Sequence, residues 1–390
     1  MPEPETEPLL MLPGPTPVVA PVLAALGRPT PGHTSATAGR ALRRVQAGCL
    51  AALGADPATE LHVIPGTGTL ALESALVNLL APGDHVVCVS HGYFGDRFAD
   101  IAERLGAEVT RLQAPWGQRV PLEAVAAAAR GGGTAVVTLT QVDTSTAVAT
   151  PIGAYARAAA SGGALVVVDA VAAAGGLPLE MTATGVDVVA FSGQKALGMP
   201  PGLALVAIGP RARARRAALA RVPSYYLDWE LWAPAMADPE GRYFATQAVN
   251  LVAAGAAAVA IAEEEGWPVR FARHRRLARA ARAGFAALGL EPAAPVEALG
   301  PTLTALRLPA GVDGAALRRE MLARQVLIAG GLGPWATSTV RIGHMGNIGR
   351  PELLTTVAAL AEALPAAGGP AARPQAGAAA VTAAFAGADV

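Results

Sequence analysis

Runs of apolar, β-branched residues alternate with alanine-rich segments of helical period, from about residue 60 to about residue 210. Continuous apolar strands that alternate with helices are typical of a mostly parallel sheet covered on both faces. The sequence therefore predicts an α/β fold with a mostly parallel central sheet flanked by helices. The strands are expected at ELHVIPG (60–66), DHVVCVS (84–90), GAEVTRL (106–112), GTAVVTLTQ (133–141), GALVVVDA (163–170), VDVVAFSG (186–193) and GLALVAIG (202–209).

The pattern changes near residue 265, where helices are separated by short strand-like runs, which predicts a smaller C-terminal α+β domain. Its elements are expected as a helix (267–288), a strand-like run (302–309), a helix (313–324), the run STVRIGHMG (338–346) and a final helix (351–364). The predicted division is an N-terminal arm (1–15), a large domain (16–260), a small domain (261–365) and an Ala/Gly/Pro-rich tail (366–390). The tail is expected to be largely disordered.

Composition and charge indicate a globular protein without a nucleic-acid or membrane partner. Of the 390 residues, 52% are hydrophobic and 15% are charged, which is ample for a large core. The formal net charge is zero, which argues against a nucleic-acid partner. The arginine-rich segments 211–221 and 270–282 are interpreted as solvated helix faces. The apolar stretch 251–262 is too short to cross a bilayer, and the acidic opening MPEPETEPLL is unlike a signal peptide, so we expect a cytoplasmic protein with no membrane partner.

One lysine stands out in the stretch FSGQKALGMPPG. Lys195 is the only lysine in the chain, because all the other residues among the 30 Lys and Arg are arginine. Arginine serves solubility and ion pairing as well as lysine does, but it cannot lose its proton near neutral pH and attack a carbonyl. A desolvated lysine amine can do so, which is how Schiff-base enzymes bind an aldehyde. Lys195 is therefore a candidate nucleophile, the alternative being an ordinary surface lysine.

Two further segments could bind parts of one ligand. In VIPGTGTLALESALVNLL a strand ends and a helix begins, so Thr67, Gly68 and Thr69 offer N–H groups and hydroxyls to an anion, or form a simple N-cap turn. In ALVVVDAVAAAGG, Asp169 ends a strand that should be buried. An ionised carboxylate there needs a partner such as a protonated pyridine nitrogen. A helix N-cap or a loop salt bridge is the alternative for Asp169.

Neighbouring parallel strands end at one edge of a sheet, so Asp169 and Lys195 are expected to lie together with the helix start at residues 67–69. An anion site, a buried carboxylate and a unique amine match the phosphate, the ring nitrogen and the aldehyde of pyridoxal phosphate. The six histidines, and Cys49 and Cys88, show no metal-ligand spacing and no disulfide framework, so no metal site is expected.

These residues lie in motifs that resemble the class V aminotransferase family of pyridoxal-phosphate enzymes, most closely its alanine–glyoxylate and serine–pyruvate aminotransferases. The resemblance implies the fold of pyridoxal-phosphate-dependent transferases, pyridoxal 5'-phosphate as cofactor and a homodimer with a shared active site. It runs from LPGPTPV (12–18) to the helix ending near residue 364 and includes GTGTLALESALVNLL, GYFGDR, TSTA, VDAVAAAGG, SGQKAL with PPG, SYYLD and GGLGP…VRIG.

The resemblance also implies roles for residues at the matching positions. Lys195 would form the Schiff base with the cofactor and Asp169 would pair with its ring nitrogen, and these two are the predicted catalytic residues. The other predicted cofactor contacts are Thr67, Gly68, Thr69 and Gln194 at the phosphate, Phe94, Ser145 and Val171 at the ring, and Tyr243 and Thr246 from the neighbouring subunit. The predicted substrate contacts are Arg341, as a clamp on the carboxylate, with Ser145 and His33.

Two segments depart from the family pattern. Relatives often read Thr-His-x-Glu-Thr-Ser-Thr-Gly where this chain has TQVDTSTA, so Gln141, Asp143 and Ala147 replace the histidine, the glutamate and the glycine. PGHTS keeps His33 but lacks the arginine that many relatives carry after it. Both segments are expected near the substrate, so these departures leave its identity open.

The predicted function is an aminotransferase that moves an amino group from a small amino acid, such as alanine or serine, to glyoxylate or pyruvate by a ping-pong mechanism. One alternative is a lyase on the same fold that performs β-elimination or C–S cleavage, although neither cysteine lies in a recognisable persulfide-accepting loop. The other is a non-catalytic scaffold. Retention of Lys195, Asp169 and Arg341 argues against a scaffold.

Overall fold

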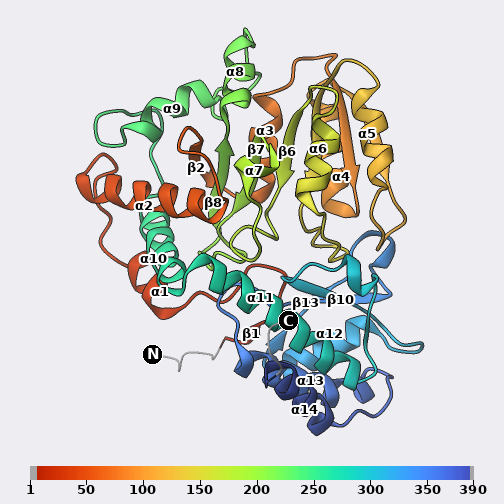
Figure 1. Ribbon diagram of the computed structural model, residues 1–390. Helices are drawn as coiled ribbons and strands as arrows, with labels where there is room; N and C mark the ends of the chain where they lie inside the picture. Colours follow the sequence, from red (N-terminus) through yellow and green to blue (C-terminus); the bar gives the residue numbers. More distant parts are fainter. Residues whose placement is uncertain (1–6, 387–390) are drawn as a thin grey trace.

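A computed structural model describes residues 7–386. Its central sheet has seven strands in the order β2-β8-β7-β6-β5-β3-β4 (Figure 1). Neighbouring strands from β7 to β4 are parallel, and β8 runs antiparallel to both of its neighbours. The predicted mostly parallel sheet is therefore confirmed. Its strands are β2 (Glu60–Gly66), β3 (His85–Ser90), β4 (Glu108–Gln113), β5 (Thr134–Thr140), β6 (Leu165–Asp169), β7 (Val188–Ser192) and β8 (Gly202–Ile208).

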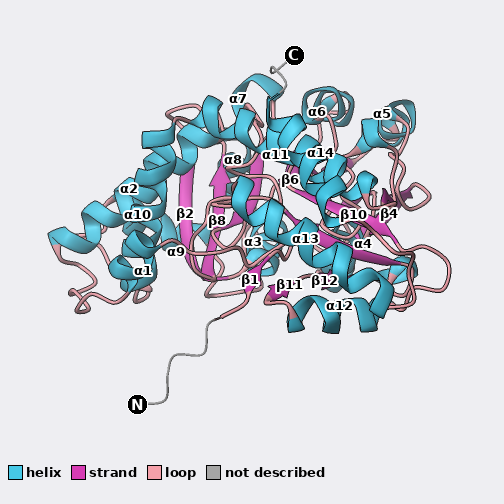
Figure 2. Ribbon diagram, turned by 90° about the horizontal axis from the view of Figure 1, so that it is seen from below, coloured by secondary structure: helices cyan, strands magenta, loops and turns pink. Residues whose placement is uncertain are grey.

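Helices lie on both sides of this sheet (Figure 2). Burial on both faces explains why the inner strands read as continuous apolar runs rather than as alternating ones. The helices of this part of the chain are α1 (Ala20–Leu26), α2 (Ala36–Ala52), α3 (Gly68–Val77), α4 (Tyr93–Arg104), α5 (Leu122–Arg130), α6 (Ile152–Ala160), α7 (Met181–Thr184), α8 (Pro210–Ala218), α9 (Trp229–Ala237) and α10 (Val249–Glu265).

A second hydrophobic core lies around a smaller antiparallel sheet with the strand order β12-β13-β10-β9. The predicted α+β character of this region is confirmed. β1 (Leu9–Leu10), which lies in the predicted N-terminal arm, pairs with β11 of this part. The remaining elements are α11 (Trp267–Ala287), β9 (Glu291–Pro292), η1 (Val296–Ala298), β10 (Leu303–Arg307), α12 (Gly314–Ala323), β11 (Val326–Leu327), β12 (Ala329–Gly330), η2 (Gly333–Trp335), β13 (Thr339–Gly343), α13 (Arg350–Ala366) and α14 (Pro374–Ala386).

Helices α8 and α11 carry the arginine-rich segments, and the interpretation of both as solvated faces is wrong in part. Arg216 of α8 is 5% exposed and pairs with Asp228, and Arg270 of α11 is 1% exposed. His274, one turn beyond Arg270, is fully buried. A period of 3.6 residues shows which positions share a face, but it does not show how many neighbouring elements cover that face.

The tail differs from the expectation of disorder over residues 374–386, which form α14. This helix packs against α11 and α13, with Val381 fully buried. Alanine has the highest helix propensity, and small residues let the helices approach closely. A methyl group on Gly377 would lie 2.3 Å from Val357 Cγ1, and one on Gly284 would lie 2.6 Å from Val381 Cγ2. The last residues of the predicted tail, 387–390, and residues 1–6 of the predicted arm lie outside the described range.

The Gly377→Ala substitution tests whether α14 is docked. In a free helix, alanine in place of glycine would add stability of about 0.5–1 kcal/mol. Against α13, however, the methyl group overlaps Val357, and overpacking costs about 1–3 kcal/mol. We therefore expect G377A to lower the thermal unfolding midpoint. The control is Q375A, at an exposed position of the same helix, which should leave the midpoint almost unchanged, whereas a rise with G377A would contradict docking.

Within residues 7–386, no helix combines the length and the apolar character needed to cross a membrane.

Candidate functional site

A pocket lies at the carboxyl ends of β6 and β7, facing the start of α3. Such edges of parallel sheets are where ligands bind in α/β proteins. The structure brings together in this pocket the predicted helix start at residues 67–69 and the two predicted strand-end residues, Asp169 and Lys195. The pocket is lined by Thr67, Gly68, Thr69, Leu72, Phe94, Arg97, Thr144, Asp169, Val171, Gln194 and Lys195.

Asp169 is the last residue of β6 and lies opposite Thr140 of β5 and Ala190 of β7 in the parallel ladder. Its side chain is nearly fully buried, and Oδ1 accepts a hydrogen bond from the backbone N–H of Val171 at 2.8 Å. Burial raises the pKa of Asp169 to about 7, although the Val171 hydrogen bond acts in the opposite direction. A carboxylate in such surroundings favours a cationic partner that faces it from the pocket.

Lys195 follows the end of β7 by three residues and is 9% exposed. Its Nζ donates a hydrogen bond to the carbonyl oxygen of Pro13. Burial, and next the charge of Arg341, lower the pKa of Lys195 to about 8, while Asp169 acts in the opposite direction. A substantial fraction of this amine is therefore unprotonated at mildly alkaline pH, as a nucleophilic amine requires.

The start of α3 forms the opposite wall. Thr67 occupies the N-cap position, yet its side chain makes no capping hydrogen bond, so its hydroxyl is free to face the pocket. A methyl group on Gly68 would lie 2.7 Å from Val171 Cγ2, so only glycine allows this close approach. Nearby, Ser192 Oγ and Gln194 Oε1 are buried without a hydrogen-bond partner. Buried polar atoms normally have partners, so these two indicate a polar ligand.

Asp143 organises the wall around Phe94. It is fully buried and Oδ2 accepts hydrogen bonds from the backbone N–H groups of Phe94 and Gly95, at 3.0 and 3.1 Å. Its Oδ1 accepts from the N–H and the hydroxyl of Ser145, at 2.8 and 2.5 Å. Burial raises the pKa of Asp143, and these four hydrogen bonds oppose that change. Ser145 does not line the pocket, and it holds the start of α4 through the N–H of Tyr93 at 3.0 Å.

Arg341 reaches this wall from the small antiparallel sheet. It lies on β13, and its guanidinium donates from Nε to the Gly330 oxygen at 2.7 Å and from Nη1 to the Thr144 oxygen at 3.1 Å. Thr144 itself lines the pocket. Burial lowers the pKa of Arg341 to about 10, so it remains a cation at neutral pH. Within residues 7–386, the third guanidinium nitrogen, Nη2, makes no hydrogen bond. It is therefore available to an anion.

Arg97 also lines the pocket, although no role was predicted for it. Its Nη1 donates to Thr69 Oγ1 at 2.7 Å, and its guanidinium lies 4.9 Å from the centre of the Phe94 ring. The signal was present in GYFGDR, because Phe94 and Arg97 are three residues apart at the start of α4 and therefore share a helix face. Asp143 was expected near the substrate only as a departure from the family pattern, with no role of its own, and Ser192 was missed.

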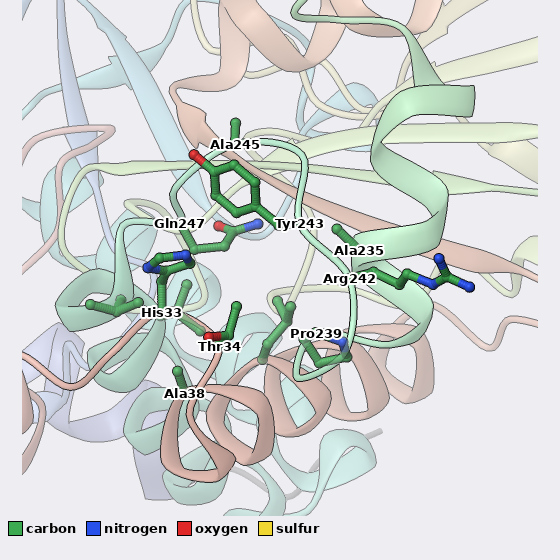
Figure 3. A pocket seen from close by; sticks show the side chains of 12 residues that line it. His33, Thr34, Ala38, Ala235, Pro239, Arg242, Tyr243, Ala245 and Gln247 are labelled. Atoms are coloured by element: carbon green, nitrogen blue, oxygen red, sulfur yellow. The ribbon is translucent and has the colours of Figure 1, made fainter.

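His33, Tyr243 and Thr246 lie outside the Lys195 pocket in the same chain. His33 and Tyr243 line a second pocket that shares no lining residue with the first, and their ring centres are 5.2 Å apart (Figure 3). Thr246 Oγ1 lies 3.3 Å from the Tyr243 hydroxyl. Tyr243 is 62% exposed, so this cluster is accessible at the surface of the single chain.

The segment TQVDTSTA contributes mainly buried support behind the pocket rather than its lining. Gln141 is buried, and its Nε2 donates to the Pro178 oxygen at 2.9 Å. Ala147 is buried in a turn with a φ of 63°, the left-handed region that favours the glycine of relatives. Of residues 140–147, only Thr144 lines the pocket. Among residues 7–386, no group of three or more His, Cys, Asp or Glu side chains is placed to hold a metal ion.

Three comparisons show which known proteins the chain is similar to. The model of the family "Aminotransferase class-V" matches residues 23–296. The chain is 34% identical over 357 residues to the small subunit of a soluble hydrogenase from Synechococcus, covering 90% of this chain and 91% of the relative. It is 33% identical over 356 residues to the L-aspartate–glyoxylate aminotransferase of Paracoccus denitrificans, covering 90% and 89%. The ureidoglycine–glyoxylate aminotransferase of Bacillus subtilis is 26% identical, has a TM-score of 0.94, and is matched over 99% of this chain and 100% of that one.

Proposed function

The chain belongs to the class V aminotransferase family and is a pyridoxal-phosphate-dependent aminotransferase, and from this premise we propose that it transfers the amino group of a small amino acid, such as alanine or serine, to glyoxylate or pyruvate. The observation that carries the proposal is the convergence of Lys195, Asp169 and the start of α3 in one pocket, with Arg341 beside it. Two of the compared proteins act on glyoxylate by name, while their amino donors differ, which favours glyoxylate as the acceptor.

The pocket fits pyridoxal phosphate at its two ends. At one end, the free hydroxyl of Thr67, the N–H groups at the start of α3 and the unpaired Ser192 Oγ would hold the phosphate, with the Gln194 amide and Thr69 beside them. At the other end, Asp169 offers a buried carboxylate to the protonated ring nitrogen. Phe94 and Val171 line the space between these ends and would cover the ring.

Different side chains of the pocket would perform proton transfer, bind the substrate carboxylate and position the pocket wall. The bound cofactor supplies an electron sink for the electrons released at the substrate Cα. Lys195 Nζ would take the proton from that Cα and return a proton later, a role suited to an amine whose pKa burial has lowered to about 8. Arg341 would hold the substrate carboxylate through its remaining nitrogen, which orients the Cα–H bond toward Lys195. Asp143 holds Phe94 and Ser145 in position through its hydrogen bonds.

A second copy of the chain would complete the site. Tyr243, Thr246 and His33 cluster at an exposed surface away from Lys195 of their own chain. Tyr225, which is 78% exposed, packs its ring near Phe244 at the same surface. Large exposed aromatic side chains are typical of protein interfaces. In a homodimer, Tyr243 and Thr246 would reach the partner's phosphate site and His33 its substrate.

The decisive experiment is a half-reaction screen without acceptor. Purified protein loaded with pyridoxal phosphate is mixed with single amino donors, including L-alanine, L-serine and L-aspartate, and the formation of pyridoxamine phosphate is followed by absorbance. We expect amination of the cofactor by a small donor, and its reversal on adding glyoxylate or pyruvate. Release of ammonia and pyruvate with no aminated cofactor would indicate a lyase instead. Both cysteines are buried, which leaves none accessible to carry sulfur in a desulfurase reaction.

A further inference from the structure

The backbone that carries Lys195 is held by groups from two other parts of the fold. Three successive carbonyl oxygens are involved. The oxygen of Gln194 accepts a hydrogen bond from the N–H of Thr16 at 3.1 Å, and the oxygen of Lys195 accepts one from Thr16 Oγ1 at 2.8 Å. The oxygen of Ala196 accepts one from Arg270 Nη2 at 2.7 Å. Thr16 belongs to the segment before α1, and Arg270 belongs to α11 at the border of the small sheet region (Figure 1).

Arg270 occupies a position that stability alone does not explain. Its side chain is 1% exposed and its Nη1 pairs with Glu265 Oε2 at 2.7 Å, while its Nε has no partner. The desolvation of a buried ion pair often exceeds the attraction it gains, so well-packed apolar residues serve the core equally well. What an apolar residue could not do is donate a directed hydrogen bond to Ala196. The guanidinium joins this carbonyl and the Glu265 carboxylate at fixed geometry.

The segment that contains Thr16 also contacts the side chain of Lys195, through Pro13 and Gly14. Pro13 in the same segment accepts the hydrogen bond from Lys195 Nζ. A methyl group on Gly14 would lie 2.5 Å from Lys195 Cδ, so the segment packs directly on the aliphatic stem of the lysine. A lysine side chain has four rotatable bonds, and its amine keeps one position only when its backbone and its stem are both restrained.

We propose that Thr16 and Arg270 are positioning residues that fix the backbone of residues 194–196 and thereby place the amine of Lys195 in the pocket. This inference rests on the proposed attachment of the cofactor to Lys195. Without either contact, the peptide around Lys195 gains freedom, and the amine moves from its place at the Pro13 carbonyl. Displacements of about 1 Å in a reacting group cost on the order of 100-fold in rate.

Arg273 provides a matched control for Arg270. It binds the same carboxylate, with its Nε 2.6 Å from Glu265 Oε1, and it is also a cation of α11. Its remaining hydrogen bonds go to the oxygens of Gly346 and Ile348, at 2.9 and 3.0 Å, and none goes to residues 194–196. Replacing Arg273 therefore removes a cation of the same ion-pair cluster without removing a hydrogen bond to the backbone of residues 194–196.

The test compares T16V and R270M with T16S and R273M. In the cofactor-loaded proteins, we expect T16V and R270M to lower the maximal rate of the amino-donor half-reaction about 10- to 100-fold with an unchanged KM for the donor. In the cofactor-free proteins, acylation of Lys195 is measured against pH by peptide mass spectrometry, which is simple because the chain has one lysine. Its midpoint should rise in T16V and R270M toward that of free lysine, because a released amine reaches water. T16S should match the wild type in both measurements, and R273M should change both of them much less than R270M does.

Two results would overturn the proposal: wild-type behaviour of T16V, or equal changes in R273M and R270M, which would indicate a general effect of the ion-pair cluster. If R270M does not fold, T16V decides, since it removes only one hydroxyl. Failure of the proposed function is a separate outcome, in which the wild type itself forms no covalent adduct with pyridoxal phosphate at Lys195.

Discussion

Replacing Lys195 with arginine is expected to abolish covalent attachment of pyridoxal phosphate and to lower the half-reaction rate by at least about 1,000-fold, since a positioned proton-transfer group alone contributes about 10²–10⁴-fold. The guanidinium keeps the positive charge near Asp169, but it neither attacks an aldehyde nor exchanges protons near neutral pH. Attachment is measured by the absorbance of the bound cofactor, and by borohydride reduction followed by peptide mapping. The rate is measured by single-turnover mixing.

The matched control for K195R adds a lysine elsewhere. Arg211 on α8 is half-exposed and pairs with Asp187, and neither residue lines the pocket, so R211K keeps a cation at a position outside the site. R211K should behave as the wild type, with the reduced adduct on Lys195 alone, and the double variant K195R/R211K should remain inactive. A scaffold protein would lose nothing with K195R. An adduct that persists in K195R would place the reactive amine at the chain terminus and contradict the site.

Replacing Asp169 with asparagine is expected to lower the half-reaction rate about 100- to 1,000-fold, the range for removal of one preorganised electrostatic group. The amide keeps the hydrogen bond from Val171 N–H but cannot hold a proton on the cofactor ring nitrogen. The stability of the cofactor-free protein should change in the opposite direction. Burial raises the pKa of Asp169 to about 7, above its ordinary value, so its ionised form penalises the folded state as pH rises through 7.

Cofactor-free D169N should therefore unfold at a higher temperature than the wild type at pH 8, and the difference should shrink toward pH 4, where the carboxyl group is protonated in the folded protein. The control is D187N. Asp187 is also buried and accepts a backbone hydrogen bond, from Val166 N–H at 2.8 Å, and burial raises its pKa too. It precedes β7, at the opposite end of the strand from Lys195. D187N should keep the half-reaction rate, and an equal loss in both variants would show that Asp169 acts only through folding.

The central sheet and the positions of the main site residues could be predicted because their signals are local. Each inner strand is a continuous apolar run, and β6 and β7 end at Asp169 and shortly before Lys195, where the runs end in the sequence. Parallel pairing of adjacent strands then brings both ends to one edge, whatever the rest of the chain does. The uniqueness of Lys195 needed no structure at all.

Other features depend on contacts between distant segments, which periodicity does not encode. The arginine run of α11 has the same spacing whether it faces water or core, and it is in the folded chain that Arg270 is buried and reaches the Ala196 oxygen. An alanine-rich tail reads as low complexity, yet α11 and α13 offer it a surface on which Gly377 and Val381 fit closely.

By itself, then, the sequence determined which reactive groups follow the predicted strands: an anion-binding helix start, a carboxylate and an amine, each at or near the end of an apolar run. The tertiary structure alone decided how these groups are held and charged. Asp143 accepts the hydrogen bond from the N–H of Phe94, and Arg341, on the small antiparallel sheet, donates to the oxygen of Thr144. Burial lowers the pKa of Lys195 and raises that of Asp169. The physical reason is that strand and helix periods arise from neighbours in sequence, whereas desolvation and directed hydrogen bonds arise from neighbours in space.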